Sequence, residues 1–189
     1  ELTMDQLKKY ETTAEYKCIK KEKENTYIVT GIKVSDIFKN YVPDMKAAAI
    51  KFCSSDGFSG TAANYEFAWD DAMIIWKKVN KDSGKEEPVK VGLNSAVNGS
   101  AGNLWIKNLA SAECTSADLV IDGRYVTKSQ MAGAENENIE TATFVMNDQE
   151  KTVTGVKINK LVKAGIIKEM PATVKFAADS YAQTVAQCE

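Results

Sequence analysis

The sequence repeats one stretch, Tyr27-Ile28-Val29-Thr30-Gly31-Ile32-Lys33-Val34-Ser35-Asp36-Ile37-Phe38. Its changed but recognisable copy is Lys151-Thr152-Val153-Thr154-Gly155-Val156-Lys157-Ile158-Asn159-Lys160-Leu161-Val162. The segments that follow the copies also match. They are Ala49-Ile50-Lys51-Phe52 with Asp56-Gly57-Phe58, and Thr173-Val174-Lys175-Phe176 with Asp179-Ser180-Tyr181. The chain therefore contains one unit and at least part of a second.

Each copy predicts a strand that bends at Gly31 or Gly155 into a short helix. The apolar residues of the first helix have the spacing of an amphipathic stripe: Val34, Ile37, Phe38 and Tyr41. In the second copy Ile158, Leu161 and Val162 keep this spacing. We expect Ser35 to cap the first helix and Asn159 to cap the second.

Other segments have the periodicity of short helices and strands. We expect helices at residues 2–9, capped by Thr3, and 127–131. We expect strands at 13–19, 27–29, 47–53, 88–93 and 104–109, and a charged turn at 20–25. The run from Trp69 to Val79 fits a long helix or a buried strand, and the polar loop after it favours a strand.

Two further segments carry turn and loop chemistry. Residues 94–103 are rich in Asn, Ser, Gly and Ala, and we expect a surface loop there. Asp122-Gly123 lies between two strand-like runs and predicts a hairpin with a type I′ turn. We expect this hairpin to open the second unit.

The charge pattern narrows the classes of partner. The formal net charge is -2 and the lysines are spread among acidic residues, so no basic face for nucleic acid is expected. No apolar run approaches the ~20 residues that cross a bilayer, and no signal peptide is recognisable. Because the sequence begins at Glu1, we expect a mature form or an excised fragment, either of which is compatible with export.

The residue inventory excludes several kinds of active site. The chain has no histidine, and Arg124 is its only arginine. Ser-His-Asp, Cys-His and His-metal sites are therefore excluded. The four cysteines are Cys18, Cys53, Cys114 and Cys188. Their spacing contains no Cys-x-x-Cys pair, and they are interpreted as buried thiols or as disulfides in an oxidising compartment.

The order of several short motifs resembles the molybdopterin-binding domain of the sulfite oxidase family. The motifs are Leu2-Thr3 with Leu7, Thr30-Gly31-Ile32 with Val34 and Asp36-Ile37-Phe38, Asp56-Gly57-Phe58, and Gly102-Asn103-Leu104-Trp105-Ile106-Lys107. The resemblance covers residue 1 to about Cys114, and residues 119 to 187 resemble the first half of the same domain again. We therefore expect a sulfite-oxidase-like unit at 1–116. Residues 117–189 are expected to be a partial copy that completes the first sheet or belongs to a longer parent protein.

The resemblance implies an α+β fold with a mixed, mostly antiparallel, barrel-like sheet and short flanking helices. It also implies that Cys18 stands where the family has its molybdenum-ligating cysteine. Asp56, Gly57 and Phe58 either frame a pterin pocket or form an ordinary turn, and Lys90 and Lys107 would supply charge to the pterin. The chain departs from the family in lacking the histidines and, in the first unit, the arginines that hold the pterin phosphate and an oxyanion substrate.

Two functions follow from these expectations. The preferred one is a non-catalytic binding or structural module, without cofactor, in a bacterial secreted or cell-envelope protein, with a protein partner or a neighbouring domain of a longer chain. The alternative is a molybdopterin-dependent oxidoreductase with Cys18 on the metal. No pattern names a small ligand.

Overall fold

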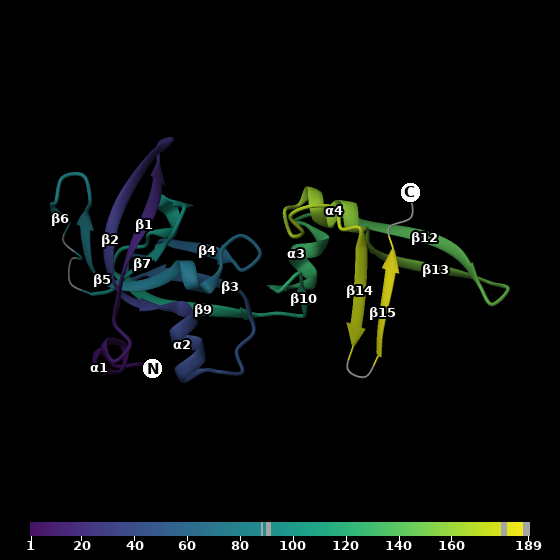
Figure 1. Ribbon diagram of the computed structural model, residues 1–189, viewed down its shortest axis with the longest axis horizontal. Helices are drawn as coiled ribbons and strands as arrows, with labels where there is room; N and C mark the ends of the chain where they lie inside the picture. Colours follow the sequence, from purple (N-terminus) through teal and green to yellow (C-terminus); the bar gives the residue numbers. More distant parts are fainter. Residues whose placement is uncertain (88, 90–91, 179–180, 187–189) are drawn as a thin grey trace. The chain divides into compact units, whose positions relative to one another are not determined.

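The computed structural model describes residues 1–87, 89, 92–178 and 181–186 (Figure 1). The chain divides into two compact units, Glu1–Thr127 and Lys128–Glu189, called here the first and the second unit. Strands dominate and the helices are short, which confirms the α+β class. Within the described part of the chain, no helix has the length and apolar character needed to cross a membrane.

The first unit begins with a helix, a hairpin, a helix and a second hairpin. In chain order its elements, with η for 3-10 helices, are α1 (Met4–Lys8), β1 (Thr12–Lys20), β2 (Lys23–Lys33), α2 (Val34–Tyr41), β3 (Ala47–Ser54), β4 (Ser59–Ala63), η1 (Trp69–Asp71), β5 (Ala72–Asn80), β6 (Glu86–Glu87), β7 (Asn94–Val97), β8 (Ser100–Ala101), η2 (Gly102–Leu104), β9 (Leu109–Ser116), β10 (Leu119–Ile121) and β11 (Arg124–Val126). The helix α1 has the predicted cap, since the backbone N–H of Gln6 donates to the Thr3 hydroxyl and Gln6 Oε1 accepts from the backbone N–H of Thr3.

The strands of the first unit form two main sheets. One has the order β6-β5-β2-β1-β8, with β7 also paired to β5, and the other has the order β4-β3-β9. Their pairings are antiparallel except for the short parallel pair β1–β8. The barrel-like sheet that we expected does not close, because the strands divide between two open sheets.

The core consists of two apolar clusters. One lies around β3, α2 and η1, where the indole N–H of Trp69 donates to the Ala47 carbonyl at 3.1 Å. The other covers β1 and β2 and includes Met73 and Ile75 from β5 and Trp105, whose indole N–H donates to the Val97 carbonyl at 3.0 Å. Burial with a satisfied N–H is the usual condition of a tryptophan that anchors a core.

Gly31 lies inside β2 and does not bend the chain as expected. A Cβ at this position would overlap the carbonyl oxygen of Ile74 and lie 2.7 Å from the Cα of Ile75. The ladder shifts at the same point, because Thr30 pairs with Lys77 whereas Gly31 pairs with Ile75. The extra residue makes a β-bulge in β5 directly beside the glycine. Glycine therefore permits the close approach of two backbones.

The helix α2 begins two residues earlier than its predicted cap requires. Its N-cap is Lys33, which makes no side-chain cap hydrogen bond, and Ser35 instead donates from Oγ to Asp70 Oδ1 at 2.6 Å. In the second copy the N-cap is Lys157 and not Asn159. Both predicted caps are therefore wrong. The Ser35 hydroxyl binds Asp70 of η1, a partner distant in sequence, instead of capping the helix.

The predicted surface loop at residues 94–103 is wrong. All four residues of β7 are buried, and they pair with β5. The polar side chains have internal partners, since Ser95 Oγ donates to the Leu104 carbonyl and accepts from the Ile106 N–H, both at 2.9 Å. Asn94 Oδ1 accepts from the Asn108 N–H at 3.0 Å. Small polar residues with satisfied hydrogen bonds pack in a core without a large desolvation cost.

The same contacts explain why the strand expected at 104–109 is absent. Leu104 ends η2, and β9 begins only at Leu109. The backbone of Leu104 and Ile106 is bound to the Ser95 side chain, and the Ile106 carbonyl accepts from the Ser95 N–H at 2.9 Å.

The strand prediction for the Trp69 region is confirmed by β5. The strand expected at 88–93 falls partly outside the described residues, and β6 pairs with β5 just before it.

Tight turns close the hairpins. Lys21 and Glu22 have φ of 48° and 64°, so the expected charged turn is only this short and the strands run through the rest of 20–25. Asp122 and Gly123 have φ of 48° and 73°, as the type I′ prediction requires. This β10–β11 hairpin belongs to the first unit, where the Tyr125 N–H donates to Asn64 Oδ1 at 2.8 Å.

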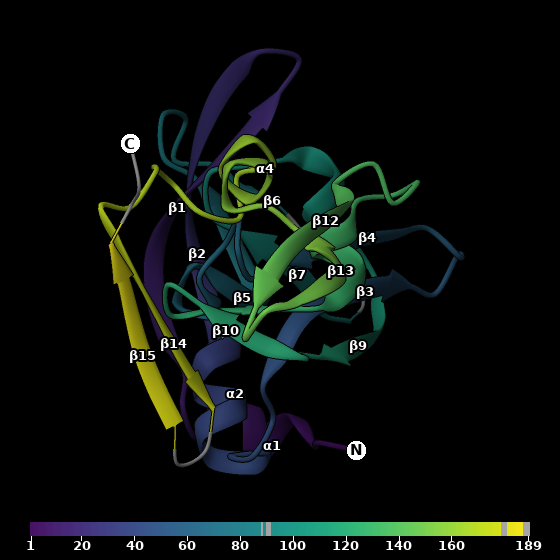
Figure 2. The same ribbon diagram turned by 90° about the vertical axis from the view of Figure 1, so that its right-hand side faces the viewer.

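The second unit has the element order of the first six elements of the first unit. Its elements are α3 (Lys128–Ala132), β12 (Ile139–Met146), β13 (Gln149–Val156), α4 (Ile158–Lys163), β14 (Thr173–Ala178) and β15 (Tyr181–Ala186). Among the described residues it forms two separate two-stranded sheets, β12–β13 and β14–β15, the latter drawn in yellow in Figure 2.

The two units also share a cross-strand pair. The hydroxyls of Thr13 and Thr30 are 2.9 Å apart in the first unit, and those of Thr141 and Thr154 are 3.2 Å apart in the second. This pair places Gly155, which directly follows Thr154, at the position of Gly31. Around Gly155 a Cβ would meet nothing within 4 Å.

The two glycines provide a matched test. Gly31→Ala is expected to lower the free energy of unfolding by at least about 1–3 kcal/mol, because the added methyl group must displace the β5 backbone. Gly155→Ala is expected to change stability by less than about 0.5 kcal/mol. Urea unfolding followed by tryptophan fluorescence measures the first variant, and circular dichroism measures the second. Equal effects of the two substitutions would contradict the packing described for β5.

Candidate functional site

Cys18, the expected molybdenum ligand, is completely buried in the core of the first unit. It lies on β1 between Asn25 of β2 and Ser100 of β8. Tyr27 and Trp105 belong to the same apolar cluster, and their ring centroids are 5.4 Å apart. The sulfur therefore has the surroundings of a packed apolar side chain.

A buried lysine lies in the same region. Lys78 of β5 has a side chain that is only 7% exposed, and its Nζ is 2.6 Å from a carboxylate oxygen of Glu87. The same Nζ lies 4.7 Å from the centroid of the Tyr27 ring and 6.0 Å from that of the Trp105 ring. An ammonium in this position is held by one charge partner and two aromatic faces.

The local electrostatics favour an ionised Glu87 carboxylate and a neutral Cys18 thiol. Burial raises the pKa of Cys18 above the ordinary value for a thiol, although the charges of Lys20 and Lys78 act in the opposite direction. Burial also raises the pKa of Glu87, but the hydrogen bond and charge of Lys78 outweigh it, and the net pKa is lowered. Cys18 is thus a protonated thiol at neutral pH, whereas a metal ligand or nucleophile must be a thiolate.

The sequence did not indicate Lys78 and Glu87. Strict alternation along β5 from the buried Met73 and Ile75 would place residue 77 inward and residue 78 outward. The bulge opposite Gly31 reverses this alternation, so that Lys77 is exposed and Lys78 is buried. The only sequence feature linked to the bulge is Gly31. Its close contact with β5 could not be recognised from the sequence, because the two strands are far apart in the chain.

Asp56, Gly57 and Phe58 form the turn between β3 and β4. The Phe58 carbonyl accepts from the Ser54 N–H, the Gly57 N–H donates to the Ser54 carbonyl, and Gly57 has φ of 89°. Asp56 Oδ1 accepts from the Phe58 N–H at 3.2 Å, and this bond lowers the pKa of the Asp56 carboxyl. The side chain of Phe58 is 55% exposed. The geometry is that of a strand-ending turn.

Of the remaining cationic candidates, the structure describes Lys107 and Arg124. Lys107 is exposed, and Lys90 lies outside the described residues. The guanidinium of Arg124 donates to the Asn64 carbonyl at 3.4 Å and so helps to hold the β10–β11 hairpin. In the part of the chain that the structure describes, no three or more Cys, Asp or Glu side chains are grouped to hold a metal ion.

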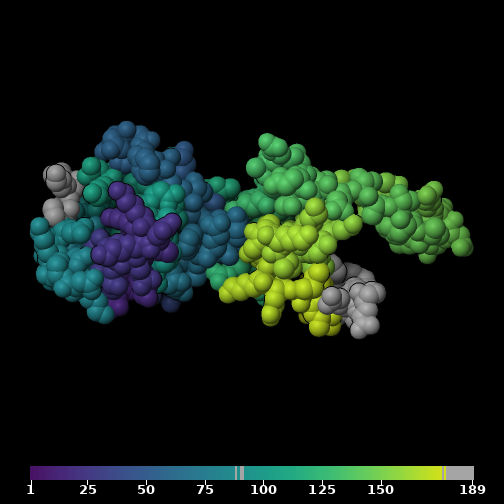
Figure 3. Space-filling model, turned by 90° about the horizontal axis from the view of Figure 1, so that it is seen from above, coloured from purple at the N-terminus to yellow at the C-terminus, as the bar shows by residue number. Residues whose placement is uncertain are grey.

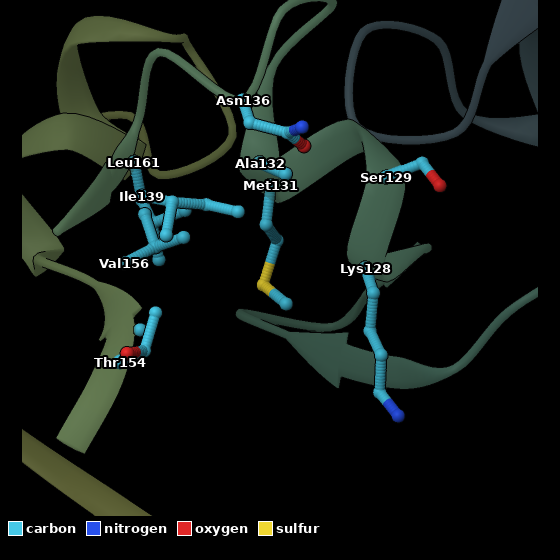
Figure 4. Close-up of a pocket in the computed structure, with 10 residues that line it drawn as sticks. Lys128, Ser129, Met131, Ala132, Asn136, Ile139, Thr154, Val156 and Leu161 are labelled. Atoms are coloured by element: carbon cyan, nitrogen blue, oxygen red, sulfur yellow. The ribbon is translucent and has the colours of Figure 1, made fainter. Parts of the chain in front are cut away.

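The second unit contains a cavity of about 530 Å³. It lies between α3, the end of β13 and α4, and its lining includes Met131, Ile139, Val156 and Leu161 (Figure 4). In Figure 4 the side chain of Met131 extends into the space, and Ile139, Val156 and Leu161 gather on one side of it. Gly155 also lines the cavity. An apolar hollow of this size suits apolar side chains better than an oxyanion.

Comparison of the chain with protein-family models, curated proteins and solved structures finds no match.

The buried ion pair has an exposed counterpart of equal length. Lys78→Met is expected to lower the free energy of unfolding by about 1–3 kcal/mol, because it leaves the partly buried Glu87 without its counter-charge. Lys81→Met breaks a 2.6 Å pair with Glu15 whose side chains are 52% and 46% exposed, and is expected to cost less than about 1 kcal/mol. Urea denaturation at neutral pH measures both.

The pH dependence gives the same test a second readout. Because the folded-state pKa of Glu87 lies below the ordinary value of 4.5, its stabilising effect is fully present above that pH and is lost as the pH falls through the folded pKa. The difference between the wild type and Lys78→Met should therefore shrink in acid. A difference that stays constant from pH 7 to pH 3 would argue against the ion pair.

Cys18 is expected to resist alkylation in the native protein. Brief treatment with iodoacetamide, followed by peptide mapping, should modify the exposed Cys114 and leave Cys18 unmodified until denaturant is added. Equal rates at the two cysteines in the native chain would show that the thiol of Cys18 is accessible and reactive.

Proposed function

We propose that the chain is a non-catalytic binding or structural module of a secreted or cell-envelope protein, with a fold related to the sulfite oxidase molybdopterin-binding domain. The relation to that domain rests on the order of the sequence motifs. The α+β class and the mixed sheet are compatible with it. The proposed lack of catalysis rests on the surroundings of Cys18.

The observation that carries the proposal is the enclosure of the Cys18 sulfur. A catalytic metal ligand is a thiolate beside an open coordination position. Cys18 is 0% exposed, is packed among apolar residues and has a raised pKa. The only cation with a buried side chain in this cluster, among the described residues, is Lys78, and it is paired with Glu87. The residues present therefore do not fit a bound molybdopterin.

The alternative, a molybdopterin-dependent oxidoreductase with Cys18 on the metal, has one observation in its favour. Lys20 and Lys78 place positive charge near the sulfur, and this charge favours the thiolate. Burial outweighs the two charges, since the net effect is a raised pKa of the Cys18 thiol. Molybdenum analysis distinguishes this oxidoreductase from the non-catalytic module.

Metal analysis tests the choice. The full chain, produced in a host that makes molybdopterin, is expected to contain far less than one equivalent of molybdenum and to unfold cooperatively. Cys18→Ala and the exposed control Cys114→Ala are expected to have the same low molybdenum content as the wild type. About one equivalent of molybdenum that is retained in Cys114→Ala and lost in a folded Cys18→Ala would establish the oxidoreductase instead.

A further inference from the structure

The hairpin of β10 and β11 is held on the first unit by contacts to Asn64. The Tyr125 N–H donates to Asn64 Oδ1 at 2.8 Å, and the guanidinium of Arg124 donates to the Asn64 carbonyl at 3.4 Å. Val126, the next residue, is 0% exposed. The hairpin, residues 117–126, lies where the colours change from teal to green in Figure 3. These contacts depend on the turn that joins β10 to β11, because the turn sets the register of the hairpin.

The turn residues, Asp122 and Gly123, carry a reactive pair of groups. Both residues are exposed, with φ of 48° and 73°, and a Cβ on Gly123 would meet nothing within 4 Å. Among the described residues, no hydrogen bond of the Gly123 N–H or of the Asp122 carboxylate is found. A backbone nitrogen can attack the side-chain carboxyl carbon of the residue before it and close a five-membered imide ring. Glycine favours this reaction because its backbone rotates most freely.

The other Asp-Gly pair of the chain, Asp56-Gly57, has both groups engaged in hydrogen bonds. The Gly57 N–H donates to the Ser54 carbonyl at 3.1 Å, and Asp56 Oδ1 accepts from the Phe58 N–H at 3.2 Å. The bond from Phe58 is also the main cause of the lowered pKa of the Asp56 carboxyl. Ring closure needs a nitrogen that can approach and a protonated carboxyl, from which the oxygen leaves as water. The hydrogen bonds therefore protect this pair.

The Asn-Gly pair of the chain, Asn98-Gly99, is engaged in the same way. The Gly99 N–H donates to the Lys17 carbonyl at 2.8 Å, and Asn98 Oδ1 accepts from the Lys17 N–H at 2.9 Å. This turn between β7 and β8 is thus tied to β1 from both groups that would have to react. Of the three pairs, Asp122-Gly123 alone has neither group bound among the described residues.

We infer that Asp122 is a site of spontaneous modification in the folded chain, where it isomerises to isoaspartate and loosens the β10–β11 hairpin from Asn64. In the first step the Gly123 nitrogen bonds to Asp122 Cγ and loses its proton, and one water leaves. Water then adds to either carbonyl of the ring and breaks that carbonyl's bond to the nitrogen. One product is aspartate and the other is isoaspartate. One water is released and one is consumed, so no other reactant is required.

Isoaspartate carries the main chain through Cβ and Cγ and so adds one atom to the backbone of the turn. A type I′ turn fits two residues with positive φ, and a longer path disturbs the pairing of the strands that it joins. In this hairpin Ile121 faces Arg124 and Val120 faces Tyr125. A disturbed pairing moves the Tyr125 N–H away from Asn64 Oδ1, which is the contact that holds the hairpin.

Peptide mapping of aged protein tests the inference. The full chain is kept for several weeks in mildly acidic buffer and digested with a protease that cleaves before aspartate but not before isoaspartate. The uncleaved fraction at Asp122 is expected to grow at least about tenfold faster than that at Asp56. Protein that carries isoaspartate, separated by chromatography, should exchange the backbone amides at 124–126 at least about tenfold faster than fresh protein.

Two matched variants separate the local structure from the chemistry. Asp122→Asn keeps a residue that suits the type I′ turn and closes the same ring with loss of ammonia, so its conversion to acid is read as a mass increase. Asp56→Asn keeps the Oδ1 acceptor for the Phe58 N–H. Asp122→Asn is expected to convert at least about tenfold faster than Asp56→Asn, because Gly57 stays bound to Ser54.

The unfolded chain provides the last control. In guanidinium chloride the hydrogen bonds of both turns are lost, and the two Asp-Gly pairs should isomerise at similar rates. A difference that persists there would show that neighbouring residues set the rate and would overturn the inference. Absence of isoaspartate at Asp122, or equal amounts at Asp56, would overturn it as well. Isoaspartate at Asp122 with unchanged exchange at 124–126 would refute the loosening of the hairpin.

Discussion

The arrangement of the first unit depends on the close approach of the β5 backbone to Gly31. Any side chain at this position would overlap the Ile74 carbonyl. The approach coincides with a bulge that reverses the alternation of β5, and the reversal turns Lys78 inward against Tyr27 and Trp105. β5 in turn pairs with β6 and β7, so three strands are placed by a contact that one missing side chain permits.

Features set by nearby residues could be predicted from the sequence. The Thr3 cap, the Asp122-Gly123 turn and the β5 strand depend on spacing within a few residues, and each was found where expected. The repeat also placed equivalent helices, because two sequences of different composition kept the same apolar spacing.

Features set by distant partners could not be predicted. Ser95 is polar and small, and only its bonds to Leu104 and Ile106 make burial of β7 favourable. Ser35 has the chemistry of a cap but binds Asp70. The position of Cys18 in the chain was known, whereas its enclosure depends on β8 and Trp105, some 80 residues further along. The candidate site was therefore the least predictable part.

The turn residues of the two repeated hairpins differ in a way that bears on folding order. Lys21 and Glu22 adopt positive φ at a conformational cost, which tertiary packing of the first hairpin must offset. Asn147 and Asp148 have φ of 53° and 59°, in a region that such short polar residues adopt more readily. Isolated hairpins form within about 1–10 μs. The β12–β13 hairpin is thus the better suited of the two to form autonomously, early on the folding pathway, before the chain around it has collapsed.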